Sequence, residues 1–175
     1  MLTIRRYAPA DHEAVCALHV DALAATGGFA GRGPWDADLD DIERGYLRDG
    51  EFLVGHKSGQ LLAMGALRPV PSSSPCFAPD QSGRAAEIKR MRVRPGHQGH
   101  GHGTAILGAL LTRASELGYE VAVLDTVAGS AAEGFYTRHG FGVTGHTVYL
   151  GFDVVLMSIS LTPALAPARE LGVRR

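Results

Sequence analysis

A glycine-rich turn between a predicted strand and a predicted helix is the segment of this sequence best suited to hold a ligand. Glycine alternates with polar residues in the run His97-Gln98-Gly99-His100-Gly101-His102-Gly103. Strand-like residues 86–93 precede it, and apolar residues at helical spacing follow from Ile106 to Leu117. The first N–H groups of such a helix lack helical partners and, with the helix dipole, form a site for an anion, usually a phosphate. Glycine suits the turn because a side chain would block the ligand or demand an unfavourable φ.

Two common phosphate-binding motifs do not fit this turn. The nucleotide P-loop ends in Gly-Lys-Ser or Gly-Lys-Thr, whereas Gly103 is followed by Thr104 and Ala105. The dinucleotide fingerprint requires glycine or alanine at its sixth position, which here holds Thr104 in one frame and Ile106 in the other. Taken alone, the turn could also be a helix start that binds no ligand.

Three motifs in this part of the chain resemble those of the GNAT superfamily of N-acetyltransferases. Residues 98–103 (Gln-x-x-Gly-x-Gly) resemble the family's pyrophosphate-binding signature, Gln/Arg-x-x-Gly-x-Gly/Ala. Residues 87–95 (Glu-Ile-Lys-Arg-Met-Arg-Val-Arg-Pro) resemble the strand that precedes this signature. Residues 132–141 (Ala-x-x-Phe-Tyr-x-x-x-Gly-Phe) are similar to the helix and strand that come later. The resemblance covers roughly residues 86–142, with the three motifs in the family's order and spacing.

The resemblance implies that the turn binds acetyl-CoA as a co-substrate and that no metal is involved. Backbone N–H groups from Gln98 to Thr104 would hold the pyrophosphate, and the Thr104 hydroxyl could contact a phosphate. Backbone groups of Met91 and Val93 would pair with the pantetheine arm, in an opening between two splayed strands that end at Val93 and begin near Val121. The expected cofactor-binding residues are Met91, Val93, Gln98, Gly99, His100, Gly101, His102, Gly103 and Thr104.

The implied reaction is acetyl transfer from acetyl-CoA to an amine of a small molecule or peptide, by direct attack in a ternary complex. The amine must lose its proton, although a lysine-like amine has a pKa of about 10.4. The developing oxyanion needs a hydrogen-bond donor, and the departing thiolate benefits from a proton. Two alternatives stay open: a sensor that binds acetyl-CoA or CoA without catalysis, and transfer of another acyl group, such as succinyl or propionyl.

Tyr136 and Glu87 are the catalytic candidates that the resemblance supplies. A phenol remains protonated at neutral pH, so Tyr136 could donate to the thiolate; its other reading is a ring packed in the core. Glu87 could act as a base through water; its other reading is a surface glutamate paired with Arg84 or Lys89. The backbone N–H of Val93 or a neighbour would hold the oxyanion. Uneven alternation in this strand would fit a β-bulge.

Other side chains near these motifs have two readings each. His97, His100 and His102 lie close together without a nearby acidic or cysteine partner, so we expect contacts with the cofactor's phosphates rather than a metal site. Trp35 and Tyr149 either line the acceptor pocket or cover the core. Four basic residues either steer the anionic cofactor or form a solvated strand face: Lys89, Arg90, Arg92 and Arg94.

The elements that must position these residues form one α/β domain. Strand-like and helix-like segments follow one another in the order β-α-α-β-β-β-α-β-α-β-β, which is typical of a mixed sheet. The resemblance implies a mostly antiparallel central sheet of about seven strands, flanked by about four helices, with splayed central strands. We place the domain at residues 1–162. The tail of residues 163–175 has no clear packing partner and is a candidate for disorder.

Composition and charge argue against several other classes of protein. The chain has 175 residues, of which 45% are hydrophobic and 20% are charged, which suits one folded core. A net charge of −1 without a basic stripe argues against nucleic acid, and no apolar stretch is long enough to span a membrane. Two cysteines without zinc or disulfide spacing fit a reducing, cytoplasmic setting. The expected partners are the amine acceptor and, as an option because dimers are common in the family, a second copy of the chain.

Overall fold

The computed structural model describes residues 1–26, 33–78, 84–149 and 151–161, which form one α/β domain. The predicted tail, residues 163–175, and parts of two predicted loops lie outside these ranges. The elements, in chain order, are β1 (Thr3–Arg6), η1 (Pro9–Asp11), α1 (His12–Ala25), η2 (Pro34–Leu39), η3 (Glu43–Leu47), β2 (Glu51–Lys57), β3 (Gln60–Pro69), β4 (Ala85–Val93), α2 (His102–Glu116), β5 (Val121–Val127), α3 (Ala131–Arg138), β6 (Gly142–Tyr149) and β7 (Phe152–Ser160).

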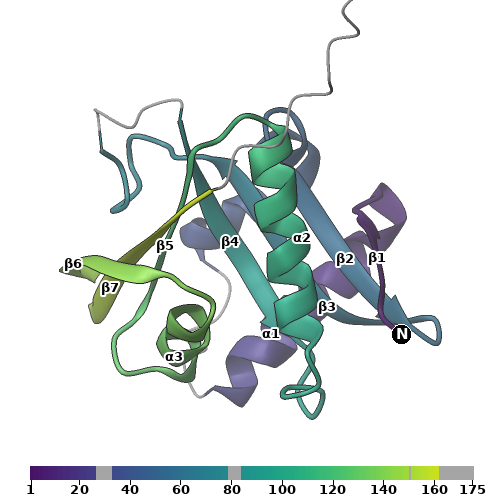
Figure 1. Ribbon diagram of the computed structural model, residues 1–175. Helices are drawn as coiled ribbons and strands as arrows, with labels where there is room; N and C mark the ends of the chain where they lie inside the picture. Colours follow the sequence, from purple (N-terminus) through teal and green to yellow (C-terminus); the bar gives the residue numbers. More distant parts are fainter. Residues whose placement is uncertain (27–32, 79–83, 150, 162–175) are drawn as a thin grey trace, which may run out of the picture.

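The central sheet contains seven strands in the order β1-β2-β3-β4-β5-β7-β6. All neighbours run antiparallel except β4 and β5, which run parallel. Figure 1 shows α2 across one face of the sheet, α1 on the other, and β5 diverging from β4 along its length. The fold class predicted from the sequence, a mixed sheet with splayed central strands, is confirmed.

The divergence of β4 and β5 begins after only three paired positions. The last pair is Glu87 with Val123, and the remaining residues of β4, up to Val93, do not pair with β5. Parallel strands that are fully paired would close this edge with backbone hydrogen bonds. The open edge is therefore the main irregularity of the sheet, and it faces the glycine-rich turn that follows β4.

A β-bulge in β4 confirms the irregularity predicted from the uneven alternation. The register between β3 and β4 shifts between Met64 and Ala66, so that Gly65 faces two residues, Arg90 and Met91. Arg90 has a φ of 56°, which is uncommon for a residue with a side chain. A Cβ on Gly65 would lie 2.4 Å from Met91 Sδ, so glycine permits the close approach at the bulge.

Two apolar layers hold the sheet between its helices. On one face, Ile106, Leu107 and Leu110 of α2 pack against β-strand residues that include Ala86 and Ile88. On the other, Val15 and Leu18 of α1 pack with Tyr46 of η3 against Phe52 and Met64. These layers fix the helix positions, because burying each large apolar side chain contributes about 1.5–3 kcal/mol.

The boundaries of some elements differ from the predictions. The second helix of the predicted element order forms instead as two short segments, the 3₁₀-helix η2 and the single π-helical turn η3. Between β2 and β3 the chain turns at Ser58-Gly59, both with positive φ, as a type I′ hairpin turn requires. Within the described residues, no helix combines the length and apolar character needed to cross a membrane.

Candidate active site

The glycine-rich turn presents free backbone N–H groups at the start of α2. Gly99 and Gly101 have φ values of 76° and 79°, a conformation that favours glycine. The Ala105 N–H donates to Gly101 O (2.9 Å), so the N–H groups of His102, Gly103 and Thr104 precede the first helical bond. No acidic residue lies in the first turn of α2. This geometry favours an anion at the helix N-terminus.

Side chains of the turn brace its own backbone. Gln98 accepts from the Gly96 N–H (3.0 Å) and donates weakly to Val93 O (3.4 Å). His100 donates through Nδ1 to Gln98 O (2.8 Å), and its ring stacks on that of His102. Loss of hydration, Lys57 and the neighbouring histidines lower the pKa of His102. Hydrogen bonds within the turn thus hold its backbone in place, and the charge of Lys57 acts on its helix end.

The Thr104 hydroxyl has a protein partner that the sequence did not predict. His139, at the end of α3, lies 2.8 Å from Phe135 O through Nδ1 and 3.0 Å from Thr104 Oγ1 through Nε2. A carbonyl accepts only, so Nδ1 carries a proton, and in the neutral ring Thr104 then donates to Nε2. The proton of the Thr104 hydroxyl is then already used in the bond to His139. The predicted phosphate contact of Thr104 would require this bond to rearrange.

The open edge of β4 presents backbone groups toward β5, as expected for a pantetheine site. The Arg94 N–H donates to Leu62 O on β3, so the adjacent Val93 directs its own N–H and C=O to the opposite edge. The carbonyl of Met91 accepts from Arg92 Nη1 (2.7 Å), and that of Val93 from Gln98. Side-chain donors therefore occupy these two carbonyls, whereas elsewhere in the sheet the backbone of a neighbouring strand does so.

Tyr136 lies in α3 beside this opening and is buried. Its ring packs edge-on against Phe135 and Phe141, with centroid separations of 5.2 and 5.6 Å. Burial raises the pKa of Tyr136 to about 12, which Arg92 opposes and Asp125 reinforces. The phenol is therefore protonated at neutral pH, and its electrostatic partners lie on β4 and β5. The ring packs in the core, as one of the two readings expected, and the role of the hydroxyl stays a prediction.

Glu87 is not the surface residue of the alternative reading. Its side chain is 1% exposed, and its partners are Arg68 Nε (3.0 Å) and Ser74 Oγ (2.5 Å). The two partners named in that alternative are committed elsewhere: Arg84 to Glu120, and Lys89 to Asp125. Glu87 is buried because Ser74, which precedes β4 in the chain, lies against it where solvent was expected.

The solvated-face reading of the basic run is wrong for Lys89 and Arg90. Lys89 pairs with Asp125 across the opening (3.1 Å). The Arg90 side chain is 9% exposed and binds Asp36 (2.7 Å), Asp38 and Trp35 O (2.7 Å). The positive φ of Arg90 thus directs its guanidinium at η2 and fastens this segment to the sheet.

Several residues of this polar layer carried no recognisable signal in the sequence. The Tyr46 hydroxyl donates to Asp38, and burial raises the pKa of Tyr46. His19 of α1 is 1% exposed, and burial followed by the charges of Arg92 and Arg90 lowers its pKa to about 4. The sequence offered one general clue: Asp36 and Asp38 in η2 carry charge opposite to that of the basic run in β4.

Cys76 lies closer to the opening than its place in a polar loop suggested. Its sulfur and carboxylate oxygens of Glu87 and Asp125 lie within 4.8 Å of one another. Burial and the two carboxylates raise the pKa of Cys76 to about 12, so it is a thiol at neutral pH and a weak nucleophile. The two carboxylates also pair with Arg68 and Lys89. Cys76 accordingly contributes an uncharged side chain beside Glu87 and Asp125.

The remaining candidates lie at the surface. Trp35 is 47% exposed at the start of η2, and Tyr149 is 41% exposed at the end of β6. Neither covers the core. Their other reading, as lining of the acceptor pocket, stays a prediction.

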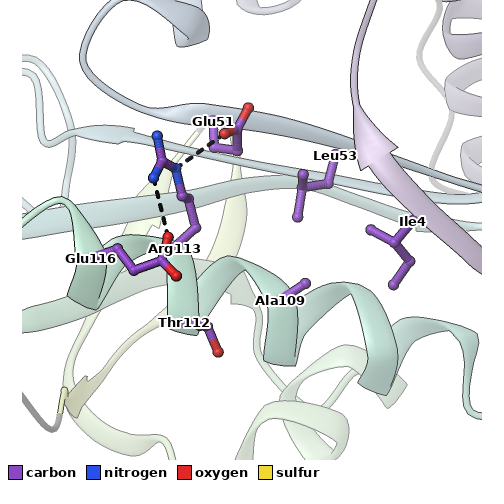
Figure 2. A pocket seen from close by; sticks show the side chains of 7 residues that line it. All are labelled: Ile4, Glu51, Leu53, Ala109, Thr112, Arg113 and Glu116. Carbon is purple, nitrogen blue, oxygen red and sulfur yellow. Dashed lines mark hydrogen bonds and ion pairs between the residues drawn. The ribbon is translucent and has the colours of Figure 1, made fainter. Parts of the chain in front are cut away.

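A separate groove lies beside the second half of α2. It has a volume of about 360 Å³ and contains no residue of the glycine-rich turn, β4 or β5. Figure 2 shows Arg113 between Glu51 and Glu116 at one end, with Ile4 and Leu53 at the other. The open, shallow groove is thus distinct from the candidate active site.

The chain belongs to the acetyltransferase (GNAT) family, whose model matches residues 15–141. It is 32% identical over 114 residues to N-acetyltransferase family 8 member 2 of Rattus norvegicus, a match that covers 63% of this chain and 47% of that protein. The chain thus spans about half the length of this curated relative.

Solved structures share the fold over nearly their whole length. The structure of yncA from Salmonella typhimurium, solved with its cofactor acetyl-CoA, is 26% identical with a TM-score of 0.74, covering 95% of this chain and 98% of that one. A ribosomal-protein-alanine N-acetyltransferase from Brucella melitensis is 22% identical with a TM-score of 0.74, covering 91% and 99%. A GNAT acetyltransferase from Staphylococcus aureus Mu50 is 16% identical with a TM-score of 0.76, covering 93% and 100%.

Proposed function

We propose that this protein transfers the acetyl group of acetyl-CoA to an amine of a small molecule or peptide, by direct attack in a ternary complex. The observation that carries the proposal is the open edge of β4, which leads directly into the free N–H groups at the start of α2. An extended arm with a pyrophosphate at one end matches this sequence of donors. Family membership and the acetyl-CoA in the yncA structure support the choice of ligand.

The cofactor would be held almost entirely by backbone groups. The N–H groups of residues 98–104 would bind the pyrophosphate, aided by the dipole of α2. The arm would then pair with Met91 and Val93 as an added strand, replacing the side-chain donors that now occupy their carbonyls. The thioester would come to lie between β4 and β5, near Tyr136 and the β-bulge.

Tyr136 would act on the departing thiolate. A phenol with a pKa of about 12 is a weak source of protons for a thiolate whose conjugate acid has a pKa of about 8.5. It is nevertheless a good hydrogen-bond donor in a site with little water, where such a bond stabilises developing charge most. The proton that ends on sulfur comes from the attacking amine, and Tyr136 would stabilise the sulfur until it arrives.

Glu87 would accept indirectly the proton that the ammonium loses before attack; the proton that the nitrogen loses after attack is the one that ends on sulfur. Both oxygens of Glu87 are engaged, one by Arg68 and one by Ser74. A proton would therefore reach Glu87 through the Ser74 hydroxyl or a water molecule, rather than by direct contact. The N–H of Val93, on the open edge, would donate to the oxyanion. None of these steps requires a metal.

Two variants of α2 test the cofactor site by calorimetric titration with acetyl-CoA. Gly101→Glu places a carboxylate at the helix N-terminus, whereas Gly108→Glu places one at an exposed position of the same helix with free space around it. We expect the wild type to bind acetyl-CoA with micromolar affinity. The affinity should fall by about 100-fold or more in Gly101→Glu and stay within about twofold of the wild type in Gly108→Glu. The cofactor proposal fails if the wild type binds neither acetyl-CoA, CoA nor succinyl-CoA.

A sensor that binds acetyl-CoA without turnover is the second candidate. The chain offers the same backbone donors to both functions, and only the side chains at the opening distinguish them. A screen of amines with detection of CoA release separates the two, because a sensor releases no CoA. Titration with succinyl-CoA in parallel reports the acyl preference.

A further inference from the structure

One cation at the opening lacks a counter-ion. Among the residues that the structure describes, Arg92 lies within ion-pair distance of no carboxylate, although four basic neighbours on β3, on β4 and just after β4 do. Those neighbouring pairs are Arg68 with Glu87 (3.0 Å), Lys89 with Asp125 (3.1 Å), Arg90 with Asp36 (2.7 Å) and Arg94 with Asp21 (3.7 Å).

The guanidinium of Arg92 lies between the open edge of β4 and the α1 face of the sheet. Nη1 donates to Met91 O (2.7 Å), while the buried Nε has no hydrogen-bond partner. The groups that act on it electrostatically are Arg90, Tyr136, Asp36 and Tyr46, and Arg92 in turn acts on His19. Arg92 therefore borders the place where the thioester and the amine would meet.

The neighbours of Arg92 do not neutralise it. Asp36 pairs with Arg90 through Oδ1, and His19 is uncharged at neutral pH because its pKa is lowered to about 4. Burial and the charge of Arg90 lower the pKa of Arg92 itself. A buried cation that pairs with no carboxylate and keeps one N–H without a partner is unfavourable, so this position is expected to stabilise something other than the fold.

We propose that Arg92 binds a carboxylate of the acceptor, and hence that the acceptor is an amine that also carries a carboxylate, as an amino acid does. The inference rests on the proposed function, which places the acceptor amine at this opening. A guanidinium is suited to a planar carboxylate because it offers several N–H donors in a fixed fork. The phosphates of the cofactor have their own donors at the start of α2, so Arg92 is left for the acceptor.

A comparison of two arginine variants tests whether Arg92 serves the fold. Arg92→Met removes a cation that has no carboxylate partner, whereas Arg94→Met, just after the end of β4, breaks a pair with Asp21 and a bond to Leu61 O. We expect the melting temperature to stay level or rise in Arg92→Met and to fall in Arg94→Met. A fall in Arg92→Met as large as that in Arg94→Met would assign Arg92 a structural role and overturn the proposal.

The acceptor class is tested with matched pairs of amines. Each of the common L-amino acids is compared with its carboxamide, in which the carboxylate is lost and the amine is kept. We expect kcat/KM to favour the carboxylates by about tenfold or more in the wild type and Arg94→Met, and by less than about twofold in Arg92→Met. Arg92→Lys keeps the charge without the fork, so part of the preference should return. Equal use of both amines by the wild type, or an unchanged preference in Arg92→Met, would overturn the proposal.

Binding measurements separate failure of this inference from failure of the proposed function. Acetyl-CoA affinity should be the same in wild type and Arg92→Met, and a loss of about tenfold or more would make Arg92 a cofactor residue instead. If acetyl-CoA binds but no amine is acetylated, acetyl transfer fails, and titration of the same amino acids into the CoA-loaded protein decides the inference. Binding that is lost in Arg92→Met supports a carboxylate site, and no binding to the wild type overturns it.

Discussion

Lys89 and Asp125 join β4 to β5 by an ion pair of 3.1 Å just beyond the last backbone pairing of these strands. The next backbone groups along β4 face an opening instead of a neighbouring strand. The pair therefore lies at the inner end of the splay, where a side-chain ion pair replaces the backbone hydrogen bonds between the strands. An ion pair at this position would limit how far β4 and β5 can separate.

The Lys89–Asp125 pair should couple energetically. Both side chains are partly buried, at 25% and 15% exposure, so solvent screens the pair less than it would on the surface. In a double-mutant cycle of Lys89→Met and Asp125→Asn, we expect a coupling of about 1 kcal/mol in the free energy of unfolding. Urea unfolding of the four proteins measures it, and strictly additive effects would show that the pair does not hold the strands together.

Gly65 should be required for the β-bulge that presents Met91. A Cβ at this position would lie 2.4 Å from Met91 Sδ and 2.8 Å from Ile106 Cγ2. We expect Gly65→Ala to lower the free energy of unfolding by about 1–3 kcal/mol and to weaken acetyl-CoA binding, because Met91 must move. The matched control is Gly142→Ala in β6, where a Cβ meets no atom within 4 Å. Similar small effects in both variants would contradict this account of the bulge.

His19 should make the protein less stable in mild acid. The folded-state pKa is lowered to about 4, mainly by burial, whereas the unfolded chain titrates near its ordinary value of about 6.5. Between these values the unfolded state binds more protons, so stability falls as the pH drops from about 6.5 to 4, by about 3 kcal/mol in total. Urea unfolding at pH 7 and 4.5 checks this. The loss should shrink in His19→Leu, and an equal loss in both proteins would assign it to other groups.

The sequence predicted those parts of the site whose geometry is local. The glycine-rich turn, the free N–H groups of α2 and the bulge depend on residues close together in the chain, and each was confirmed in the structure. The fold class, a mixed sheet with splayed central strands, was implied by the family resemblance and is confirmed as well. Local backbone geometry leaves a pattern in the sequence because glycine and apolar spacing encode it directly.

The polar layer over the opening could not be predicted in the same way. Arg90 reaches Asp36 and Asp38 more than 50 positions earlier in the chain, and Glu87 reaches Arg68, 19 positions away. The pairs of Arg90 follow from how η2 packs on the sheet, and that of Glu87 follows from the register of β3 on β4, where Arg68 lies opposite it. No spacing rule encodes either. Only the folded protein could show that, within the basic run of residues 89–94, Arg92 has no carboxylate partner among the described residues.

Tyr136→Phe tests the central claim most directly, because this variant removes one hydroxyl and keeps the ring that packs against Phe135 and Phe141. The measurement is the rate at which acetylated amine forms from acetyl-CoA, followed by mass spectrometry, beside the acetyl-CoA affinity of each protein. We expect the wild type to form product, and Tyr136→Phe to do so about tenfold more slowly or worse with unchanged affinity. Equal rates in the two proteins, or acetyl-CoA binding by the wild type without any acetylated amine, would contradict the account.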